Sequence, residues 1–495
     1  MMITEQRMPQ GVAALYWIQA FSTFSFALLY SSLSLYLTQQ LGFSSKTSNT
    51  LVGLFLALNH VLHLWGGVLG GSYLSNRSLF FMTNIMRCIG MLFLVWPKHS
   101  MLYTGLSLFL VGCGLNTTCY NNLLTQRFKA HDEERRDKAF FLSYAAMNIG
   151  FFAGYILSGF CDYSNEYESL FGMSIASNLI VALIMLVYWS DFADTDMLLS
   201  KVTHPLMRRK KALLGFASIL ILIPLVIVGF HFSHLSNAVV VIVSSMMLVI
   251  ILFLGRKQQV KADCQKIKAF LILTLTSIIF WMIYYTGPMG ITLFIKNNVD
   301  KHFLGYELAT QWIMNINALV IIVGAPLVSN MISTLRAKGV HVSVSMQFVG
   351  AFLLLALSFF FLSMGVLGAD SQGYSSLSWI VAHFMAQSIS ELLIAPVGYA
   401  MIGRIAPSHL QGLLMGTWMM VSGVAASLSH YFSNAMVQSD ETNPLVTNVD
   451  FLHVFNQLGL WALIGALFLY VVSGTIRSLI NNGAQQETQG EFLAV

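Results

Sequence analysis

The chain has 495 residues, of which 56% are hydrophobic and only 9% are charged, and its formal net charge is +5. A composition this apolar is typical of a protein that crosses a membrane several times, and in lipid such a chain is built from helices that satisfy their own backbone hydrogen bonds. The basic residues cluster in short segments between apolar stretches. The positive charge therefore indicates membrane topology and excludes a nucleic-acid partner as its explanation.

Fourteen apolar stretches follow one another along the chain, each long enough to cross a hydrocarbon core of about 30 Å as a helix. Two short basic segments divide them into groups of six, two and six. The predicted spans are 11–37, 48–72, 79–96, 101–127, 138–160, 168–190, 213–231, 235–254, 268–295, 306–332, 341–366, 376–402, 410–436 and 452–478.

Lysine and arginine predict the orientation of these spans. If both chain ends are cytoplasmic, the outward loops hold only Lys46, Lys98, Lys296 and Lys301 of the 26 basic residues. The opposite orientation would invert this ratio, against the rule that cytoplasmic loops carry the excess of positive charge. We therefore expect a multi-pass protein of the cell inner membrane with both termini in the cytoplasm.

The grouping of the spans predicts three parts. These are a six-helix bundle at 1–200, an inserted two-helix hairpin with basic flanks at 201–267, and a second six-helix bundle at 268–495. Two six-helix bundles joined by a basic link resemble the layout of the major facilitator superfamily. That resemblance implies an all-α fold with 14 transmembrane helices, in which substrate is bound near the bilayer midplane between halves that rock alternately. The hairpin is expected to be peripheral and not to touch the substrate.

A run from the predicted fourth helix into the fifth carries a more specific resemblance. It reads Gly112-Cys-Gly-Leu-Asn116, then Asp132-Glu-Glu-Arg-Arg-Asp137, then Asn148-Ile-Gly150. This run is similar to the proton-dependent oligopeptide transporter family, and so are the glycine-rich segment 66–77 and Ser390-Glu391 further along. The resemblance extends in order over nearly the whole chain. It implies a transporter of small peptides or related solutes.

The chain departs from the family pattern where that pattern carries charge. The first helix of the family holds Glu-x-x-Glu-Arg, and the matching positions here are Gln19, Ser22 and Thr23. Thr117 stands at the place of a lysine, and Tyr285 at the place of an acid. Gly71 stands at the place of an aspartate in the loop between the second and third helices. In the family these charges couple protons and hold the peptide carboxylate. The resemblance therefore leaves the substrate and the proton coupling open.

Glu391 is the acid of the family pattern that this chain retains. It lies in an apolar run of a predicted span, where an unpaired charge costs about 3 kcal/mol or more and is a candidate functional site by default. A carboxylate at this depth could bind the amine of a substrate or take up a proton, and the family match implies the amine. The alternative is a protonated acid that hydrogen-bonds to a neighbouring helix.

Three further ionisable side chains lie inside predicted spans. Arg87 could replace the anion-binding arginine that is missing from the first helix, could pair with Glu391, or could extend along its apolar stem to the cytoplasmic surface. His60 and His63 are three residues apart and so lie on one helix face. They could supply a proton site or serve as hydrogen-bonding groups, because histidine titrates near neutral pH. Two histidines without a third ligand do not predict a metal site.

Other polar and aromatic residues complete the candidate site. The resemblance implies that Tyr144, Asn148 and Asn317 hydrogen-bond the substrate. Trp281 and Trp418 match aromatic residues of the family's cavity or gate, and the alternative for them is plain packing. The predicted substrate-binding residues are Glu391, Tyr144, Asn148, Asn317, His60, Tyr30, Thr117, Tyr285, Trp281 and Trp418, and the proton-coupling candidates are Glu391, His60, His63 and Arg87.

These residues predict a secondary active transporter of a small, amine-bearing solute. One alternative is the same fold with a changed substrate, such as an amino acid derivative, a nucleoside-like compound or a siderophore, and no proton coupling. An alternative of another class is a transport-deficient sensor, against which the short loops argue. No nucleophile–base pair, metal cluster or phosphate-binding loop points to an enzyme, and no cofactor is expected. The expected partners are the solute, protons and membrane lipids, and we expect a monomer that binds no nucleic acid.

Overall fold

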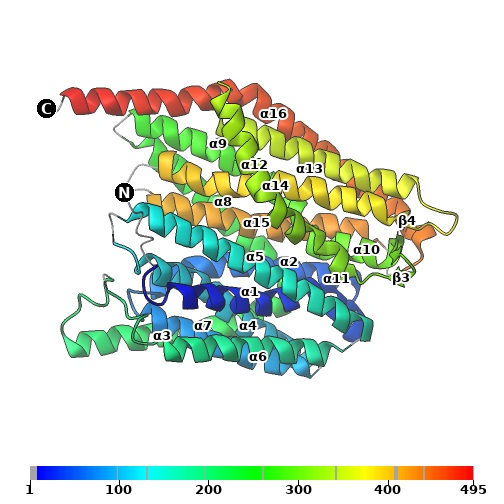
Figure 1. The fold of residues 1–495 in the computed structure, drawn as a ribbon, viewed down its shortest axis with the longest axis horizontal. Coiled ribbons are helices and arrows are strands. Elements are labelled where there is room, and N and C mark those ends of the chain that lie inside the picture. The colour runs from blue at the N-terminus through cyan, green and yellow to red at the C-terminus, as the bar shows by residue number, and fades with distance from the viewer. Residues whose placement is uncertain are drawn as a thin grey trace, which may run out of the picture. The chain divides into compact units, whose positions relative to one another are not determined.

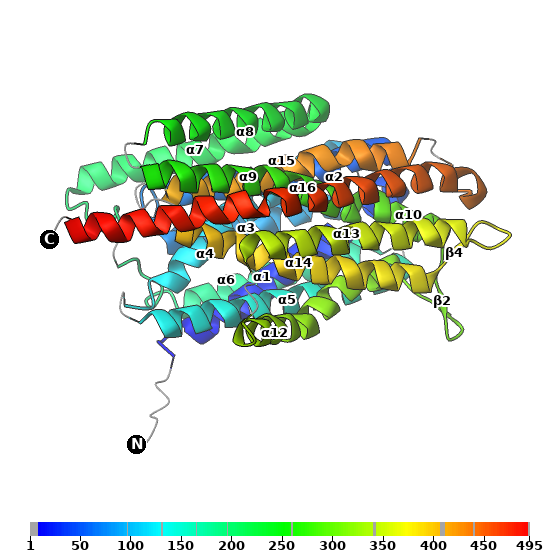
Figure 2. The same cartoon turned by 90° about the horizontal axis from the view of Figure 1, so that it is seen from above.

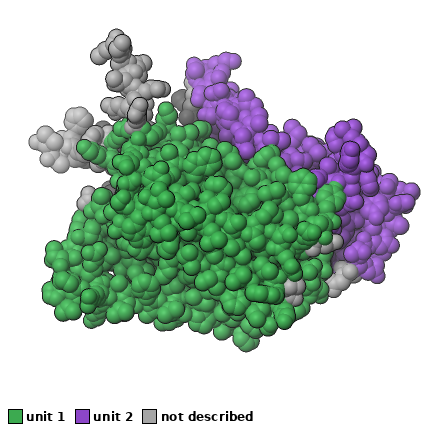
Figure 3. All heavy atoms as spheres, turned by 60° about the horizontal axis from the view of Figure 1, so that its bottom comes forward, with its two compact units in different colours: residues 1–43, 58–233 green, residues 44–57, 234–495 purple. Residues whose placement is uncertain are grey.

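The structure is a computed structural model that describes residues 8–96, 98–129, 132–164, 166–195, 197–258, 261–339, 343–405, 411–438 and 441–493. These residues are almost entirely helical, and their strands are only two residues long (Figure 1). Contacts between Cα atoms divide the chain into two compact units, which Figure 3 distinguishes by colour. The first unit comprises residues 1–43 and 58–233, and the second comprises residues 44–57 and 234–495.

The first unit contains seven of the long helices, one of them in part. They are α1 Val12–Leu35 with the π-helical turn η1 Tyr36–Gln40, the second half of α2 Ser45–Leu69, α3 Asn76–Val95, α4 His99–Thr125, α5 Glu133–Ser164, α6 Tyr167–Val187 and α7 Pro205–His231. The first half of α2 belongs to the second unit.

Small residues and short polar side chains hold the helices of the first unit together. α3 packs along both α4 and α6, and α1 packs along α5 and α6 (Figure 1). Gly150 of α5 lies so close to α1 that a Cβ atom there would be 2.3 Å from the carbonyl oxygen of Ala20. Ser31 of α1 shares a hydrogen bond of 2.7 Å with Ser158 of α5. Such contacts are typical of helices that associate in lipid, where no hydrophobic force drives them together.

The second unit contains the remaining helices and the strands. They are α8 Ser233–Arg256, α9 Lys261–Tyr284, η2 Gly287–Ile291, α10 Thr292–Asn298, β1 Val299–Asp300, β2 His302–Phe303, β3 Tyr306–Glu307, α11 Thr310–Met314, α12 Ile316–Ala337, α13 Val344–Leu367, β4 Ser375–Ser376, α14 Leu377–Ile405, α15 Gln411–Met436 and α16 Pro444–Leu493. Figure 2 shows α13 running beside α14 and α16, and these pairs are in contact.

One predicted span is not a single α-helix. The span 268–295 runs through α9, the π-helical turn η2 and α10. Pro288 lies in η2 and has no N–H to donate, so the regular hydrogen-bond ladder is interrupted at this point. β1 then pairs in parallel with β4, while β2 and β3 form a short antiparallel hairpin at the same end.

The predicted spans agree with the helices in number and order. Thirteen helices among the described residues are long and apolar enough to cross a membrane. α15, which has some side chains outside the described set, is not among these thirteen. The predicted division into a bundle, a hairpin at 201–267 and a second bundle stays a prediction. The contacts between Cα atoms divide the chain in another way, with α7 in the first unit and α8 in the second. The predicted cytoplasmic ends include residues 1–7 and 494–495, which lie outside the described residues.

Candidate functional site

A pocket of about 300 Å³ opens within the first unit, among α1, α2, α3, α4 and α5. Most of its polar lining consists of amides, hydroxyls and imidazoles. The lining residues are Gln19, Ser22, Thr23, Phe26, Asn59, His60, His63, Phe80, Arg87, Cys113, Asn116, Thr117, Tyr120, Asn121, Met147 and Phe151. Gln19, Ser22 and Thr23, which replace the charged motif of the first helix, all line it. None of these lining residues is acidic.

Arg87 is the charged group of this pocket. Its side chain is only 1% exposed, so it does not extend to the cytoplasmic surface as one of the sequence interpretations proposed. Two of its nitrogens donate to Ser22 of α1, one to the hydroxyl and one to the backbone carbonyl. The guanidinium carbon lies 5.3 Å from the ring centroid of Phe109. Nε has no hydrogen-bond partner among the described residues, and no described acid forms an ion pair with Arg87.

His60 and His63 face the same pocket from α2. Their ring centroids are 5.6 Å apart, so the predicted sharing of one helix face is confirmed. The backbone carbonyl of His63 accepts a hydrogen bond of 2.7 Å from Thr118. Around these rings the described residues supply no group of three metal-ligating side chains. The two imidazoles and Arg87 thus line the same pocket.

The other candidates of the first unit are not all brought to this pocket. Thr117 lines it, as expected from its place on α4. Tyr30 lies in an aromatic cluster, with its ring centroid 5.6 Å from that of Phe26. Asn148 is buried and donates 2.8 Å to the carbonyl oxygen of Tyr144 one turn earlier on α5. Tyr144 itself is 41% exposed, and neither residue is among those that line the pocket.

Glu391 is the centre of a second polar cluster, in the second unit. The hydroxyl of Tyr284 on α9 donates to Oε2 of Glu391 at 2.7 Å, and Nδ2 of Asn317 on α12 donates to the same oxygen at 3.3 Å. Asn317 also donates to Ser388, one turn before Glu391, at 3.0 Å. Among the described residues no cation pairs with Glu391 and no group bonds to its other oxygen. Two helices, α9 and α12, thus hold one carboxylate of α14 by neutral donors.

The predicted substrate-binding role of Tyr285, the residue that follows the end of α9, stays a prediction. Tyr285, which stands at the place of the family acid, does not hydrogen-bond to Glu391, whereas Tyr284 does. Both rings contact Trp281, with centroid distances of 5.3 Å for Tyr284 and 5.9 Å for Tyr285. Trp418 on α15 is only 4% exposed. Tyr284 and Ser388 are the members of this cluster that sequence reasoning missed, because they are common polar residues without a charge to mark them.

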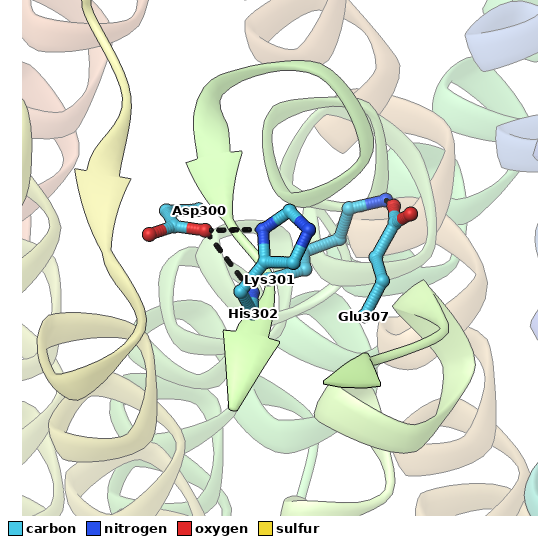
Figure 4. A network of polar contacts seen from close by, with 4 residues as sticks. All are labelled: Asp300, Lys301, His302 and Glu307. Carbon is cyan, nitrogen blue, oxygen red and sulfur yellow. Dashed lines mark hydrogen bonds and ion pairs between the residues drawn. The ribbon is translucent and has the colours of Figure 1, made fainter. Parts of the chain in front are cut away.

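A charged cluster lies at one end of the second unit, around a polar cavity of about 590 Å³. Oδ1 of Asp300 lies 2.8 Å from Nδ1 of His302 and accepts the backbone N–H of the same residue at 3.1 Å, and Nζ of Lys301 lies 2.9 Å from Glu307 (Figure 4). These contacts hold the pKa of Asp300 and that of Glu307 below their ordinary values, with His302 as the main cause for the first and Lys301 for the second. The cluster braces the β2–β3 hairpin.

An acid that sequence reasoning missed lies in the segment after α6. Oδ2 of Asp194 accepts the backbone N–H of Asn76 at 2.8 Å, and Oδ1 accepts the side-chain amide of the same residue at 3.1 Å. Asn76 is the first residue of α3, so a negative charge here is favourable to the helix N-terminus. Gly71, which stands at the place of a family aspartate, lies in the turn just before, with a φ of 74°. Asp194 therefore supplies an acid near the turn from which the family acid is missing.

This helical membrane fold, with a buried cation in one pocket and a carboxylate of α14 bonded by α9 and α12, is that of a polytopic membrane transporter of the major facilitator type. A model of the POT family matches residues 77–449 of the chain. The protein belongs to the POT family of proton-dependent oligopeptide transporters, which are transporters and not enzymes. The predicted family and fold class are thereby confirmed.

Relatives with known names match along nearly the whole chain. The dipeptide and tripeptide permease A of Salmonella typhimurium is 27% identical over 469 residues, which are 94% of this chain and 92% of the permease. The dipeptide and tripeptide permease B of the same organism is 26% identical over 483 residues, which are 97% of this chain and 98% of that permease.

Solved structures show the same fold. A crystal structure of peptide transporter POT in complex with sulfate has a TM-score of 0.83 and 20% sequence identity, covering 95% of this chain and 96% of the other. A POT family transporter in complex with 5-aminolevulinic acid has a TM-score of 0.82 and 19% identity, covering 94% and 97%. The chain is thus a multi-pass membrane protein that resembles peptide permeases.

Proposed function

We propose that this protein moves a small amine-bearing solute across the inner membrane by alternating access, with di- and tripeptides as the first class to test. In this proposal both termini are cytoplasmic, as the distribution of lysine and arginine favours. The full-length similarity to dipeptide and tripeptide permeases supports a peptide-like solute. The particular solute and its coupling ion are matters of experiment.

The environment of Glu391 carries the proposal. Its carboxylate receives two hydrogen bonds on Oε2, while no described residue bonds to Oε1 or neutralises the charge. A carboxylate at this depth is costly unless something compensates it. An ammonium group of a solute or a proton would do so, and we assign Glu391 to one or both. Asn317 positions the carboxylate through Oε2 and through Ser388.

Arg87 is positively charged and so is suited to bind an anionic group of the solute. The lining of its pocket is neutral apart from this guanidinium, and its Nε has no partner within the described chain. We assign Arg87 to the solute carboxylate, in place of the family arginine for which Thr23 stands here. His60 and His63 are assigned as hydrogen-bond donors or proton acceptors beside it, and Tyr144 and Asn148 as further contacts of the solute.

One observation favours the alternative of a changed substrate. Gln19, Ser22 and Thr23 make the first-helix side of the pocket neutral, and the positive charge enters from α3 instead. A solute with a carboxylate at another distance from its amine, or one moved without protons, would fit this change. The peptide proposal and this alternative differ in which solute is carried, and both require flux.

The test is uptake of a labelled dipeptide by proteoliposomes, with and without an inward proton gradient. We expect gradient-driven uptake by the wild type and its loss in Glu391→Gln. Glu307→Gln is the matched control, because it makes the same change in an acid whose side chain is 49% exposed in the charged cluster, and it should retain uptake. Flux that is absent for dipeptides but present for another amine would overturn the peptide assignment. Binding without any flux would point to a sensor.

A further inference from the structure

α2 is shared between the two compact units, and its first half packs on α15 within the second unit. The two helices come close at Gly53, where a Cβ atom would be 3.0 Å from Cβ of His430 and 3.1 Å from the carbonyl oxygen of Ala426. Nearer the start of α2, Lys46 donates to the carbonyl oxygen of Gln438 at 3.0 Å. These residues form a seam between the first half of α2 and the C-terminal part of α15, with Gln438 just past the end of α15.

A buried amide of the inserted hairpin lies on this seam. Asn237, on the first turns of α8, has no exposed surface. Its Oδ1 accepts a hydrogen bond of 2.6 Å from Ser427 of α15, and the same hydroxyl lies 3.1 Å from the backbone carbonyl of Asn237. Its Nδ2 donates to the carbonyl oxygen of Thr50 on α2 at 3.4 Å. One side chain thus bonds to both helices of the seam.

The same contact is reinforced between the two helices directly. Asn434 of α15 donates to Oγ1 of Thr50 at 3.3 Å. The ring of His234, on the same end of α8 as Asn237, lies 6.4 Å from that of His430. A buried polar group that loses its hydrogen bonds costs free energy. Separating α2 from α15 therefore disrupts a polar cluster to which α8 contributes the central amide.

We propose that α8 acts as a clamp and that Asn237 is its positioning residue, which holds the first half of α2 against α15. The hairpin then takes part in the transport cycle without touching the solute, because α2 can leave α15 only when the bonds of Asn237 break. This inference goes beyond the proposed function. It concerns a helix movement that can be observed whatever the solute is.

The test measures how often the seam opens. Ala426 has no exposed surface and lies under Gly53. We would introduce Ala426→Cys and follow its labelling by a membrane-impermeant maleimide in proteoliposomes, subtracting the labelling of the same protein without this change. Asn237→Leu should accelerate labelling about fivefold, the factor that corresponds to the net loss of one buried hydrogen bond. Ser427→Ala should accelerate it in the same direction.

Ser244→Ala is the matched control. Ser244 is also a buried polar residue of α8, it has no hydrogen-bond partner among the described residues, and its replacement should leave the labelling rate unchanged. Asn237→Asp, which keeps the acceptor for Ser427, should lie between wild type and Asn237→Leu. If Asn237→Leu does not elute as a folded monodisperse protein, the labelling rate of Ser427→Ala tests the clamp in its place. Labelling at the wild-type rate in folded variants would overturn the clamp.

Transport gives a second readout that distinguishes this inference from the proposed function. In a functional assay the clamp predicts a changed maximal uptake rate with an unchanged KM, because Asn237 does not contact the solute. A failure of dipeptide uptake in every variant would count against the peptide assignment alone. Accelerated labelling in Asn237→Leu would still support the clamp in that case.

Discussion

Arg87 on α3 is joined to Ser22 on α1 by two hydrogen bonds, one to the hydroxyl and one to the backbone carbonyl at 2.5 Å. Ser22 stands where the family pattern has an acid, and Thr23 where it has an arginine, so the positive charge of this pocket comes from α3 and not from α1. The guanidinium is buried, its Nε has no partner among the described residues, and no lining residue is acidic, which supports the proposal that Arg87 binds an anionic group of the solute.

Replacing Arg87 should affect solutes according to their carboxylate. We expect Arg87→Gln to raise the KM for a dipeptide about tenfold or more, which corresponds to the loss of one charge-assisted contact. A dipeptide with an amidated C-terminus should be transported by Arg87→Gln as by the wild type. The measurement is concentration-dependent uptake of the two solutes. An equal loss for both would assign Arg87 to the structure of the bundle and not to the solute.

Removing the hydroxyl of Tyr284 should weaken the function of Glu391. In Tyr284→Phe the carboxylate loses its 2.7 Å donor, and hydrogen bonds to charged groups contribute about 1.5–3 kcal/mol. We expect dipeptide uptake at low substrate concentration to fall about tenfold or more. Tyr285→Phe is the control at the next residue, just past the end of α9, since its hydroxyl does not bond to Glu391. Impaired uptake in Tyr285→Phe together with normal uptake in Tyr284→Phe would contradict the role of the Tyr284 hydrogen bond.

A side chain at Gly150 should separate α1 from α5. The Cβ atom of Gly150→Ala would be 2.3 Å from the carbonyl oxygen of Ala20, and backbone cannot rotate away as a side chain can. Overpacking of this kind costs about 1–3 kcal/mol, so the thermal midpoint in detergent should fall by several degrees. Gly172→Ala in α6 has no atom within 4 Å of the new Cβ and should leave the midpoint unchanged. Equal midpoints in the two variants would contradict the close contact.

The charged cluster of Figure 4 should make stability depend on acid pH. The pKa of Asp300 and that of Glu307 are lowered by folding, so their contribution to stability is complete above the unfolded values near 4 and is lost as the pH falls through the folded values. The thermal midpoint of the wild type should therefore fall more between about pH 5 and about pH 3 than that of the double variant Asp300→Asn, Glu307→Gln. Parallel pH profiles would show that these contacts do not form in solution.

Helix number and family were predictable because each depends on the order of residue types along the chain. A span is recognised from its length and hydropathy alone, and the spacing of motifs such as Asn148-Ile-Gly150 survives any rearrangement in space. Glu391 was also predictable, since a lone acid in an apolar run is conspicuous. The break in the span 268–295 was harder to predict from the sequence, although Pro288 lies at it.

The partners of these residues were decided by the tertiary structure. Tyr284 and Tyr285 are adjacent and chemically identical, and the rotation of about 100° between successive helix positions leaves only Tyr284 bonded to Glu391. Arg87 had three possible destinations in the sequence, and the packing of α3 on α4 and beside α1 directs it into a pocket.

The role of Asn237 could not be predicted from the sequence, because it is an uncharged amide in a hairpin that was expected to be peripheral. Only the structure shows that its side chain bonds to both α2 and α15. Periodicity reports which face of a helix a residue occupies, whereas hydrogen bonds depend on which other helix covers that face. The sequence alone therefore determined the spans, the family and the candidate charges, and the three-dimensional packing determined which neutral groups hold them.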